Sequence, residues 1–269
     1  MIGNINQVGI LVDVTRCTGC NKCVDACADA NHLGVSDFII QQSPDGLSAH
    51  RWSSIVESPE GGEYVRKFCR HCLEPACVSA CPVGAMYRTS EGVVLYDSQK
   101  CMGCRYCMMA CPFGIPRYEW DSPTPLVQKC TLCYARLEQG KLPACVETCP
   151  EGVLTFGERD ELLALANQRL QEAAHIYIPK IYGAYDVGGT AVMYISHVPL
   201  DFLGYHGAPG DEPRPELTWE WLGKVPAISI GVAGLMTGFF WIIERRVQVN
   251  LARKARESQT DEARDISHP

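Results

Sequence analysis

Residues 100–112 read KCMGCRYCMMACP, a stretch that holds four cysteines and places a proline directly after the last one. The chain has 16 cysteines, and they fall into four such sets with none left over. In chain order the sets are Cys17, Cys20, Cys23 and Cys27; Cys69, Cys72, Cys77 and Cys81; Cys101, Cys104, Cys107 and Cys111; and Cys130, Cys133, Cys145 and Cys149. The sequence therefore contains one cysteine motif repeated four times.

Three kinds of cysteine chemistry compete to explain this repeat. Disulfides need Cα atoms about 4.4–6.8 Å apart with converging side chains, which cysteines spaced by two or three residues fit poorly. Structural zinc takes one ion per four ligands, and only the fourth set, with CTLC and CVETC, has the spacing of a zinc ribbon. The run Cys-x2-Cys-x2-Cys-x3-Cys is instead that of bacterial ferredoxins, so we expect [4Fe–4S] clusters.

The spacing also predicts how the clusters share ligands. Three thiolates from one tight loop cap three corners of a cube, and the next gap begins a helix that carries the fourth thiolate to a neighbouring cluster. Pro82, Pro112 and Pro150 follow the last cysteine of sets two, three and four, where a proline suits a sharp change of direction. Ala28 takes that place in set one, so we expect the chain to leave that set differently.

If each set lends its last cysteine to a partner set, the four sets form two pairs. Sets two and three are close in sequence, which predicts quartet C (Cys69, Cys72, Cys77 and Cys111) and quartet D (Cys81, Cys101, Cys104 and Cys107). Sets one and four are then the outer pair. Basic residues stand beside the start of each set, at Arg16, Lys67, Lys100 and Lys129. They could raise cluster potentials, but a solvated role at a loop edge is favoured. Within the loops, covering the clusters is favoured over tuning them for Arg70, His71, Arg105 and Tyr106.

Composition narrows the function further. The chain has 269 residues and a formal net charge of −7, which argues against a nucleic-acid partner because phosphate binding needs a basic face. The N-terminal residues show no charged region followed by an apolar run and a cleavage site, so we expect no signal peptide. No residue forms a candidate acid, base or nucleophile with a partner at motif spacing. We therefore expect a protein that is not itself an enzyme.

The remaining segments carry weaker signals. Residues 28–66 alternate apolar pieces with turn signals and predict a hairpin-like insertion. Residues 158–174 have leucines at helical spacing and predict an amphipathic helix on the cysteine-rich domain. Residues 175–224 are expected to form an extended linker over a surface. For His175, His197 and His206, a solvated or hydrogen-bonded role is favoured over metal or haem ligation.

The segment 225–243 predicts a transmembrane helix. It contains 19 residues without a charge, close to the about 20 that span a bilayer. Five basic residues and one acid follow it between Glu244 and Arg256, which places residues 244–269 in the cytoplasm and the cysteines on the outer, periplasmic side. Because clusters are assembled in the cytoplasm, we expect export together with a partner that bears a twin-arginine signal.

With the four sets and the C-terminal helix in view, the chain resembles the four-cluster iron–sulfur subunits of the molybdopterin oxidoreductase superfamily. It is most similar to the beta subunits of membrane-bound respiratory formate dehydrogenases and to HybA-type hydrogenase subunits. The resemblance is carried by the cysteine sets, CPFGIPRYEW (111–120), QKCTLCYARLEQGKLPACVETCP (128–150), GGTAVMYISHVPL (188–200) and the terminal helix.

This resemblance implies an α+β fold with two pseudo-symmetric ferredoxin-like dicluster units in residues 1–157, followed by one transmembrane helix. The outer unit would comprise about 1–66 and 116–157, and the inner unit about 67–115. Together with the nesting of the sets, it implies quartet A (Cys17, Cys20, Cys23 and Cys149) and quartet B (Cys27, Cys130, Cys133 and Cys145). Four clusters would pass single electrons between a catalytic subunit, containing molybdopterin, tungstopterin or nickel and iron, and a membrane cytochrome b or quinone-reactive subunit. Formate dehydrogenase is favoured over hydrogenase and other molybdopterin reductases, with a zinc-binding structural module as a distant alternative.

Overall fold

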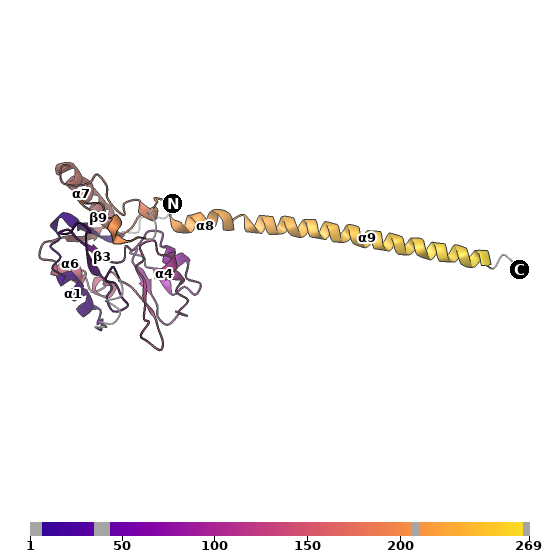
Figure 1. Cartoon of the computed structure of the whole chain (residues 1–269), viewed down its shortest axis with the longest axis horizontal. Coiled ribbons are helices and arrows are strands. Elements are labelled where there is room, and N and C mark those ends of the chain that lie inside the picture. Colours follow the sequence, from indigo (N-terminus) through magenta and orange to yellow (C-terminus); the bar gives the residue numbers. More distant parts are fainter. Residues whose placement is uncertain (1–6, 35–43, 206–209, 266–269) are drawn as a thin grey trace. The chain divides into compact units, whose positions relative to one another are not determined.

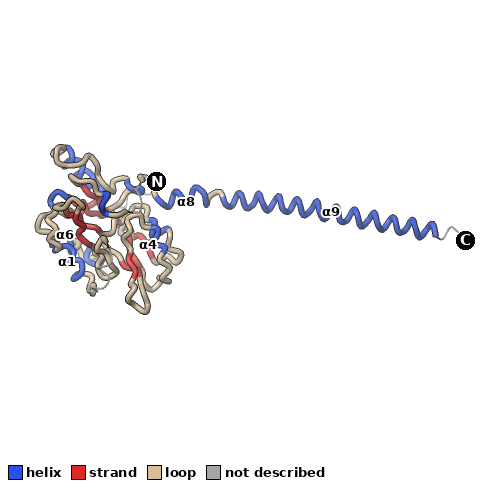
Figure 2. The backbone as a smooth tube through the Cα atoms, in the orientation of Figure 1, coloured by secondary structure: helices blue, strands red, loops and turns tan. Residues whose placement is uncertain are grey.

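A computed structural model describes residues 7–34, 44–205 and 210–265 of the chain. It divides into two compact units, Met1–Leu217 and Thr218–Pro269. Figure 1 gives the element labels, and Figure 2 shows that strands and short helices are joined by long loops in the first unit. The second unit is helical in its described part.

A three-stranded sheet organises the first unit. Strand β1 (Val8–Asp13) lies in its middle, antiparallel to β8 (Leu154–Glu158) and parallel to β9 (Val192–Ile195). Both faces of β1 are covered, which explains why VGILVD is almost continuously apolar. The β1–β8 pairing brings the segments around the first and the last cysteines side by side.

The two faces of this sheet serve different purposes. On one face, Leu11, Met193 and Ile195 pack against Leu162 and Ala166 of helix α7 (Arg159–Glu172). On the other face, the side chains belong to the same apolar core as buried cysteines such as Cys130 and Cys145. The sheet therefore forms a wall behind the cysteine loops, and α7 covers its back.

Strand β9 differs from the sequence expectation. Residues 175–224 were expected to run extended over a surface, yet all four residues of β9 are buried in the sheet. Its continuous apolar run, VMYI, is typical of a strand buried on both faces. The expectation was wrong at this point because the partner strand β1 lies about 180 residues away in the sequence.

Short helices hold some of the cysteines, and short hairpins lead into loops that hold others. The hairpins are β2 (Ser54–Glu57) with β3 (Tyr64–Lys67), β4 (Met86–Arg88) with β5 (Val94–Tyr96), and β6 (Arg117–Tyr118) with β7 (Val127–Gln128). The helices are α1 (Lys22–Ala30), α3 (Ala76–Ser79), α4 (Tyr106–Ala110), α5 (Tyr134–Leu137) and α6 (Ala144–Thr148). Helix α1 packs on α6, and α3 packs on α4. In Figure 1, α1 and α6 lie together on one side of this unit and α4 lies on the other.

The C-terminal part consists of α8 (Arg214–Leu222) and α9 (Val225–Asp265). Among the described residues, the helical stretch Arg214–Lys254 is long and apolar enough to cross a membrane, with a mean hydropathy of 1.8 in its most apolar window. This judgement rests on length and composition. The segment 225–243 lies within it, and the helix continues into the segment predicted to be a cytoplasmic tail.

Candidate metal centres

The same backbone conformation recurs in all four cysteine loops. In each Cys-x2-Cys pair, the residue before the second cysteine has a positive φ, namely 69° at Gly19, 46° at His71, 74° at Gly103 and 55° at Leu132. Glycine adopts this conformation freely, whereas a residue with a side chain pays about 1–3 kcal/mol of strain. Such strain persists where the surroundings impose it, often at a functional site. The four loops are thus built to one local plan.

This plan directs backbone N–H groups at sulfur. Gly103 N–H donates to Cys101 Sγ at 3.4 Å, and Leu132 N–H donates to Cys130 Sγ at 3.3 Å. After the last cysteine of a set, Ala85 N–H donates to Cys81 Sγ at 3.2 Å. Burial raises the pKa of the Cys81 thiol, but the backbone N–H groups of residues 83–86 outweigh it and lower that pKa. At Cys81 the backbone N–H groups therefore favour the thiolate, which is the form that binds metal.

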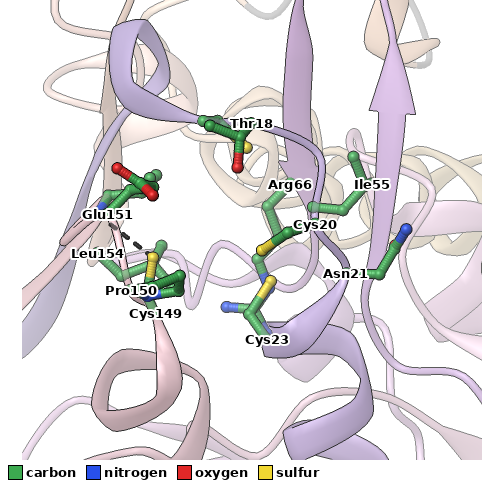
Figure 3. A pocket seen from close by; sticks show the side chains of 12 residues that line it. Thr18, Cys20, Asn21, Cys23, Ile55, Arg66, Cys149, Pro150, Glu151 and Leu154 are labelled. Carbon is green, nitrogen blue, oxygen red and sulfur yellow. Dashed lines mark hydrogen bonds between the residues drawn. The ribbon is translucent and has the colours of Figure 1, made fainter.

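Cys17, Cys20, Cys23 and Cys149, the residues of quartet A, line one cavity. Cys17 and Cys20 come from the loop between β1 and α1, Cys23 lies in the first turn of α1, and Cys149 follows α6. Figure 3 shows Cys20, Cys23 and Cys149 around this cavity, with Arg66 at its wall. Val153 N–H donates to Cys149 Sγ at 3.4 Å and helps to fix it there. The β1–β8 pairing thus brings together cysteines more than 120 residues apart.

Two further cavities are also lined by four cysteines each. Cys27, Cys130, Cys133 and Cys145, the residues of quartet B, line one of them. Cys81, Cys101, Cys104 and Cys107, the residues of quartet D, line the other. In each of these cavities, one cysteine is the last member of a different set.

The residues of quartet C also lie close to one another. Burial raises the pKa of the Cys72 thiol well above its usual value, and the neighbouring charges of Cys111, Cys69 and Cys77 raise it further. Cys111 is buried and is the last cysteine of the third set. Its position among the cysteines of the second set repeats the exchange seen in the three cavities. That these four groups each ligate a cluster stays a prediction.

The donor groups fit an iron–sulfur cluster better than the alternatives. All 16 cysteines are free thiols, so the structure contains no disulfide. A zinc site needs four ligands within about 2.3 Å of one ion, and no three His, Cys, Asp or Glu side chains in the described ranges converge to hold a single metal ion. In A, B and D the four cysteines instead line a cavity, an arrangement that suits a four-iron cube.

Burial makes these sites poor places for free thiolates. It is the first cause that raises the pKa of Cys23 to about 11, of Cys107 to about 11 and of Cys77 to about 12. A thiolate is therefore stable here only beside positive charge. Iron supplies that charge, and thiolates are soft ligands that suit it. Burial and donor chemistry are thus consistent with bound clusters.

The chain leaves set one differently from the other sets. Helix α4 ends at Ala110 and α6 ends at Thr148, each directly before a cysteine that is followed by proline. Helix α1 instead continues past Cys27 to Ala30. The side-chain amide of Asn31 then donates to Cys27 Sγ at 3.7 Å and to Cys27 O at 2.8 Å. A side chain thus takes the place of the backbone donor four residues after the last cysteine.

The four basic residues beside the sets divide into two kinds. Lys100 and Arg16 are exposed, in keeping with a solvated role. Lys67 and Lys129 are buried, but their ammonium groups have partners. Lys67 Nζ lies 2.8 Å from Asp45 Oδ2 and donates to Leu203 O at 2.6 Å. Lys129 Nζ donates to Val94 O at 2.5 Å, so both lysines help to hold the loops together.

The residues within the cysteine loops also fall into two groups, one buried and one exposed. Arg70 and His71 are buried, and the Arg70 guanidinium lies 3.8 Å from the centre of the Tyr194 ring. Burial lowers the pKa of His71 well below its usual value, with the charge of Lys129 as the second cause. Tyr106 is exposed, and Arg105 lies 5.2 Å from the centre of the Trp120 ring. Arg70 and His71 therefore belong to the interior around the second set.

Nothing in the sequence pattern singles out Arg66. It precedes the second set and would be assigned to that set by its position. In the structure, it is buried and lines the cavities of both quartet A and quartet B. The sequence contains no signal that Arg66 of β3 lies beside loops from both ends of the cysteine-rich segment.

Where the structure describes them, the candidate histidines do not gather at a site. His175 is exposed, whereas His197 Nε2 lies 2.8 Å from Glu63 Oε2. His206 lies outside the described residues. Of the three candidates, the two within the described residues, His175 and His197, are thus solvated or paired with a carboxylate.

Comparisons with known proteins agree with the cysteine chemistry. Residues 61–159 match the family model of the 4Fe-4S dicluster domain, and residues 15–30 match that of a 4Fe-4S binding domain. The formate dehydrogenase-O iron-sulfur subunit of Escherichia coli (strain K12) is 38% identical over 246 residues, 84% of this chain and 79% of that protein.

Two other relatives extend this comparison. The iron-sulfur subunit of the nitrate-inducible formate dehydrogenase of the same strain is 34% identical over 272 residues, 95% of this chain and 90% of that protein. The hydrogenase-2 operon protein HybA of Escherichia coli O157:H7 is 36% identical over 236 residues, 73% of this chain and 72% of that protein. The similarity to each of them covers most of the chain.

Proposed function

Because the chain belongs to the family of iron–sulfur subunits that includes those of formate dehydrogenases and HybA, we propose that it relays single electrons through four [4Fe–4S] clusters. Quartets A, B, C and D hold one cluster each. The observation that supports this most strongly is the repeated exchange of cysteines, in which the last member of one set lines the cavity of another. This exchange links the clusters in pairs, with an outer unit of about 1–66 and 116–157 and an inner unit of about 67–115.

We further propose the order A, B, C, D along the relay. Cys23 of quartet A and Cys145 of quartet B are close enough for their charges to interact. The same holds for Cys130 of quartet B and Cys69 of quartet C, and for Cys77 of quartet C and Cys107 of quartet D. Quartets A and D are then the two ends. Cys20 of quartet A is exposed, in keeping with a terminal site.

In this role the protein positions the clusters and excludes water from them. Each cluster, when bound, accepts and releases one electron. The buried side chains around quartets B and C, such as Leu132 and Phe68, keep the interior of the relay dry. The backbone N–H groups in the loops stabilise the sulfur ligands. The chain needs no acid, base or nucleophile of its own for this task.

We propose two protein partners, one for each end of the relay. One is the catalytic subunit of a formate dehydrogenase, and the other is a membrane cytochrome b or quinone-reactive subunit. The apolar part of α9 supports a membrane anchor, and the basic residues after it support a cytoplasmic C-terminus. The cysteine-rich unit then faces the periplasm, and the folded protein crosses the membrane with a partner that has a twin-arginine signal.

A hydrogenase is the second candidate for the catalytic partner. The 36% identity to HybA supports it about as well as the identities of 34% and 38% support formate dehydrogenase. Purifying the full chain from mild detergent extracts of its own cells separates the two candidates, because the co-purifying catalytic subunit contains either a pterin cofactor or nickel. A chain that co-purifies with neither subunit contradicts both candidates.

The cluster content can be measured directly. We expect the anaerobically purified full chain to contain about 16 iron and 16 sulfide per protein, as four cubes require, and no zinc. It should be brown, bleach with dithionite and, without its partners, reduce artificial dyes only. Zinc in place of iron and sulfide contradicts the proposal, because it indicates a structural module.

A further inference from the structure

Arg66 lines the cavity of quartet A and also the cavity of quartet B. It lies on β3, opposite Ile55 of β2, and only 2% of it is exposed. A residue in this position stands between two neighbouring metal centres.

Within the described residues, the guanidinium of Arg66 has no carboxylate partner. Its Nε and Nη1 atoms are buried without a hydrogen-bond partner in this part of the chain. By contrast, the next residue, Lys67, is paired with Asp45. A buried charge without a partner is strongly unfavourable, so such groups are almost always compensated. The structure therefore requires a source of negative charge beside Arg66.

The surrounding structure holds this side chain in place. The hydroxyl of Tyr194 donates to the backbone carbonyl of Arg66 at 2.7 Å. The guanidinium carbon of Arg66 lies 4.1 Å from the centre of the Phe68 ring. Backbone and guanidinium are thus both anchored, and the donors are held near the two cavities without depending on solvent.

The cysteines are the nearest source of compensating charge. Burial lowers the pKa of Arg66, but the charges of Cys145, Cys23, Cys27 and Cys130 raise it to a value above the usual one. One of these four cysteines belongs to quartet A and three belong to quartet B. Four thiolates around a [4Fe–4S] core give a net negative group in either redox state, and its sulfurs accept hydrogen bonds.

We propose that Arg66 is shared by the clusters of quartets A and B, donates hydrogen bonds to sulfur at both, and raises the reduction potential of both. This inference rests on the proposed cluster assignment. Reduction adds an electron to an already negative cluster, and a fixed cation beside it favours the reduced form. Because one side chain acts on both clusters, their potentials shift in the same direction.

The test compares three variants of the full chain, purified anaerobically in detergent, in redox titrations followed by electron paramagnetic resonance. Arg66→Gln removes the charge, and Arg66→Lys keeps it with fewer donors. Lys67→Gln is the matched control, because it removes a buried cation from the next position of β3 and leaves Asp45 paired with Arg117. Cys20→Ser and Cys133→Ser variants identify the signals of quartets A and B.

We expect Arg66→Gln to move the potentials of A and B to more negative values and to leave C and D unchanged. Arg66→Lys should give a smaller shift of the same sign, and Lys67→Gln should leave A and B unchanged. If Arg66→Gln instead loses only clusters A and B, with iron falling by half, while Arg66→Lys retains them, the proposal is also supported.

The proposal is overturned if A and B keep their wild-type potentials in Arg66→Gln, or if all four clusters shift equally. Loss of all four clusters in both Arg66 variants also overturns it, because Arg66 then serves folding alone. These outcomes differ from a failure of the proposed function, in which the unaltered chain itself lacks four clusters.

Discussion

The inner and outer cysteine pairs use the same motif but are closed by different parts of the chain. Quartets C and D draw their cysteines from residues 69–111, where α3 packs on α4 and β4 pairs with β5. Quartets A and B draw theirs from residues 17–149, where α1 packs on α6 and β1 pairs with β8. The inner pair is thus built from contacts that are local in sequence, and the outer pair depends on a sheet that joins distant segments.

The cysteine motif alone therefore does not stabilise both pairs, because the outer pair also needs contacts between distant segments. Closing a long loop costs more conformational entropy than closing a short one. The outer pair must recover this cost from the buried sheet β8–β1–β9, whereas the inner pair depends on it less. The buried cations also differ: Lys129, whose charge acts on Cys77 of quartet C, donates to two backbone carbonyls, whereas Nε and Nη1 of Arg66 have no hydrogen-bond partner within the described residues. Changes in the sheet should therefore damage the outer pair first.

The largest effect is expected from Gly9→Ala in β1. A Cβ atom at Gly9 would lie 2.2 Å from the carbonyl oxygen of Ala191, which accepts a hydrogen bond from Ile10 N–H at 3.0 Å. Because the clashing atom belongs to the backbone of β-sheet residues and cannot move away without disturbing the sheet, we expect a loss of about 1–3 kcal/mol or more in the free energy of unfolding. Denaturant unfolding of the full chain measures this loss. Resonance spectra should show the signals of A and B weakening before that of D.

The matched control is Gly157→Ala in β8, because Gly157 is paired directly with Gly9. A Cβ atom there would meet Leu162 Cδ2 at 3.7 Å, which is an ordinary contact. The free energy of unfolding should change by no more than about 0.5 kcal/mol. If the two alanine variants are equally stable, the outer pair does not depend on the close approach of β1 to β9.

The next largest effect is the loss of a single cluster, and it tests the exchange of ligands in both pairs. Cys149→Ser should remove the signal of A and spare B, whereas Cys145→Ser should remove B and spare A, although both cysteines belong to the fourth set. In the inner pair, Cys111→Ser should first damage C, although Cys111 belongs to the third set. Each variant should lose up to about a quarter of the iron. Loss of D in Cys111→Ser would contradict the inner exchange.

The sequence was sufficient to predict the local structure where the metal chemistry depends on the spacing of nearby cysteines. The intervals between Cys101, Cys104, Cys107 and Cys111 predict a loop followed by a helix, and the structure has α4 at Tyr106–Ala110. It was insufficient where function depends on distant segments. Strand β9 lies in a segment that the sequence predicts as a linker, because its partner β1 is distant in the sequence. Arg66 could not be assigned from the sequence, because β3 directly precedes the cysteines of the inner pair whereas Arg66 lines the cavities of the outer pair. A single sequence contains no signal for either contact.

The smallest effect is expected from Asn31→Ala, at the exit of set one. The amide of Asn31 donates to Cys27 Sγ and Cys27 O, so its removal should cost about 0.5–1.5 kcal/mol of stability. A donor to sulfur also stabilises the reduced cluster, and we expect the potential of B to become slightly more negative, by less than in Arg66→Gln.

Asn167→Ala in α7 is the control for this last change. The amide of Asn167 donates to Leu163 O at 2.9 Å, four residues earlier, as the Asn31 amide does to Cys27 O, but it bonds no sulfur. Asn167→Ala should therefore leave every potential unchanged in a redox titration. If Asn31→Ala leaves the potential of B where it was, or shifts A by as much as B, the amide at the end of α1 does not replace the backbone donor that follows the other three sets. Set one would then differ from the other sets only in the length of the helix that contains its last cysteine.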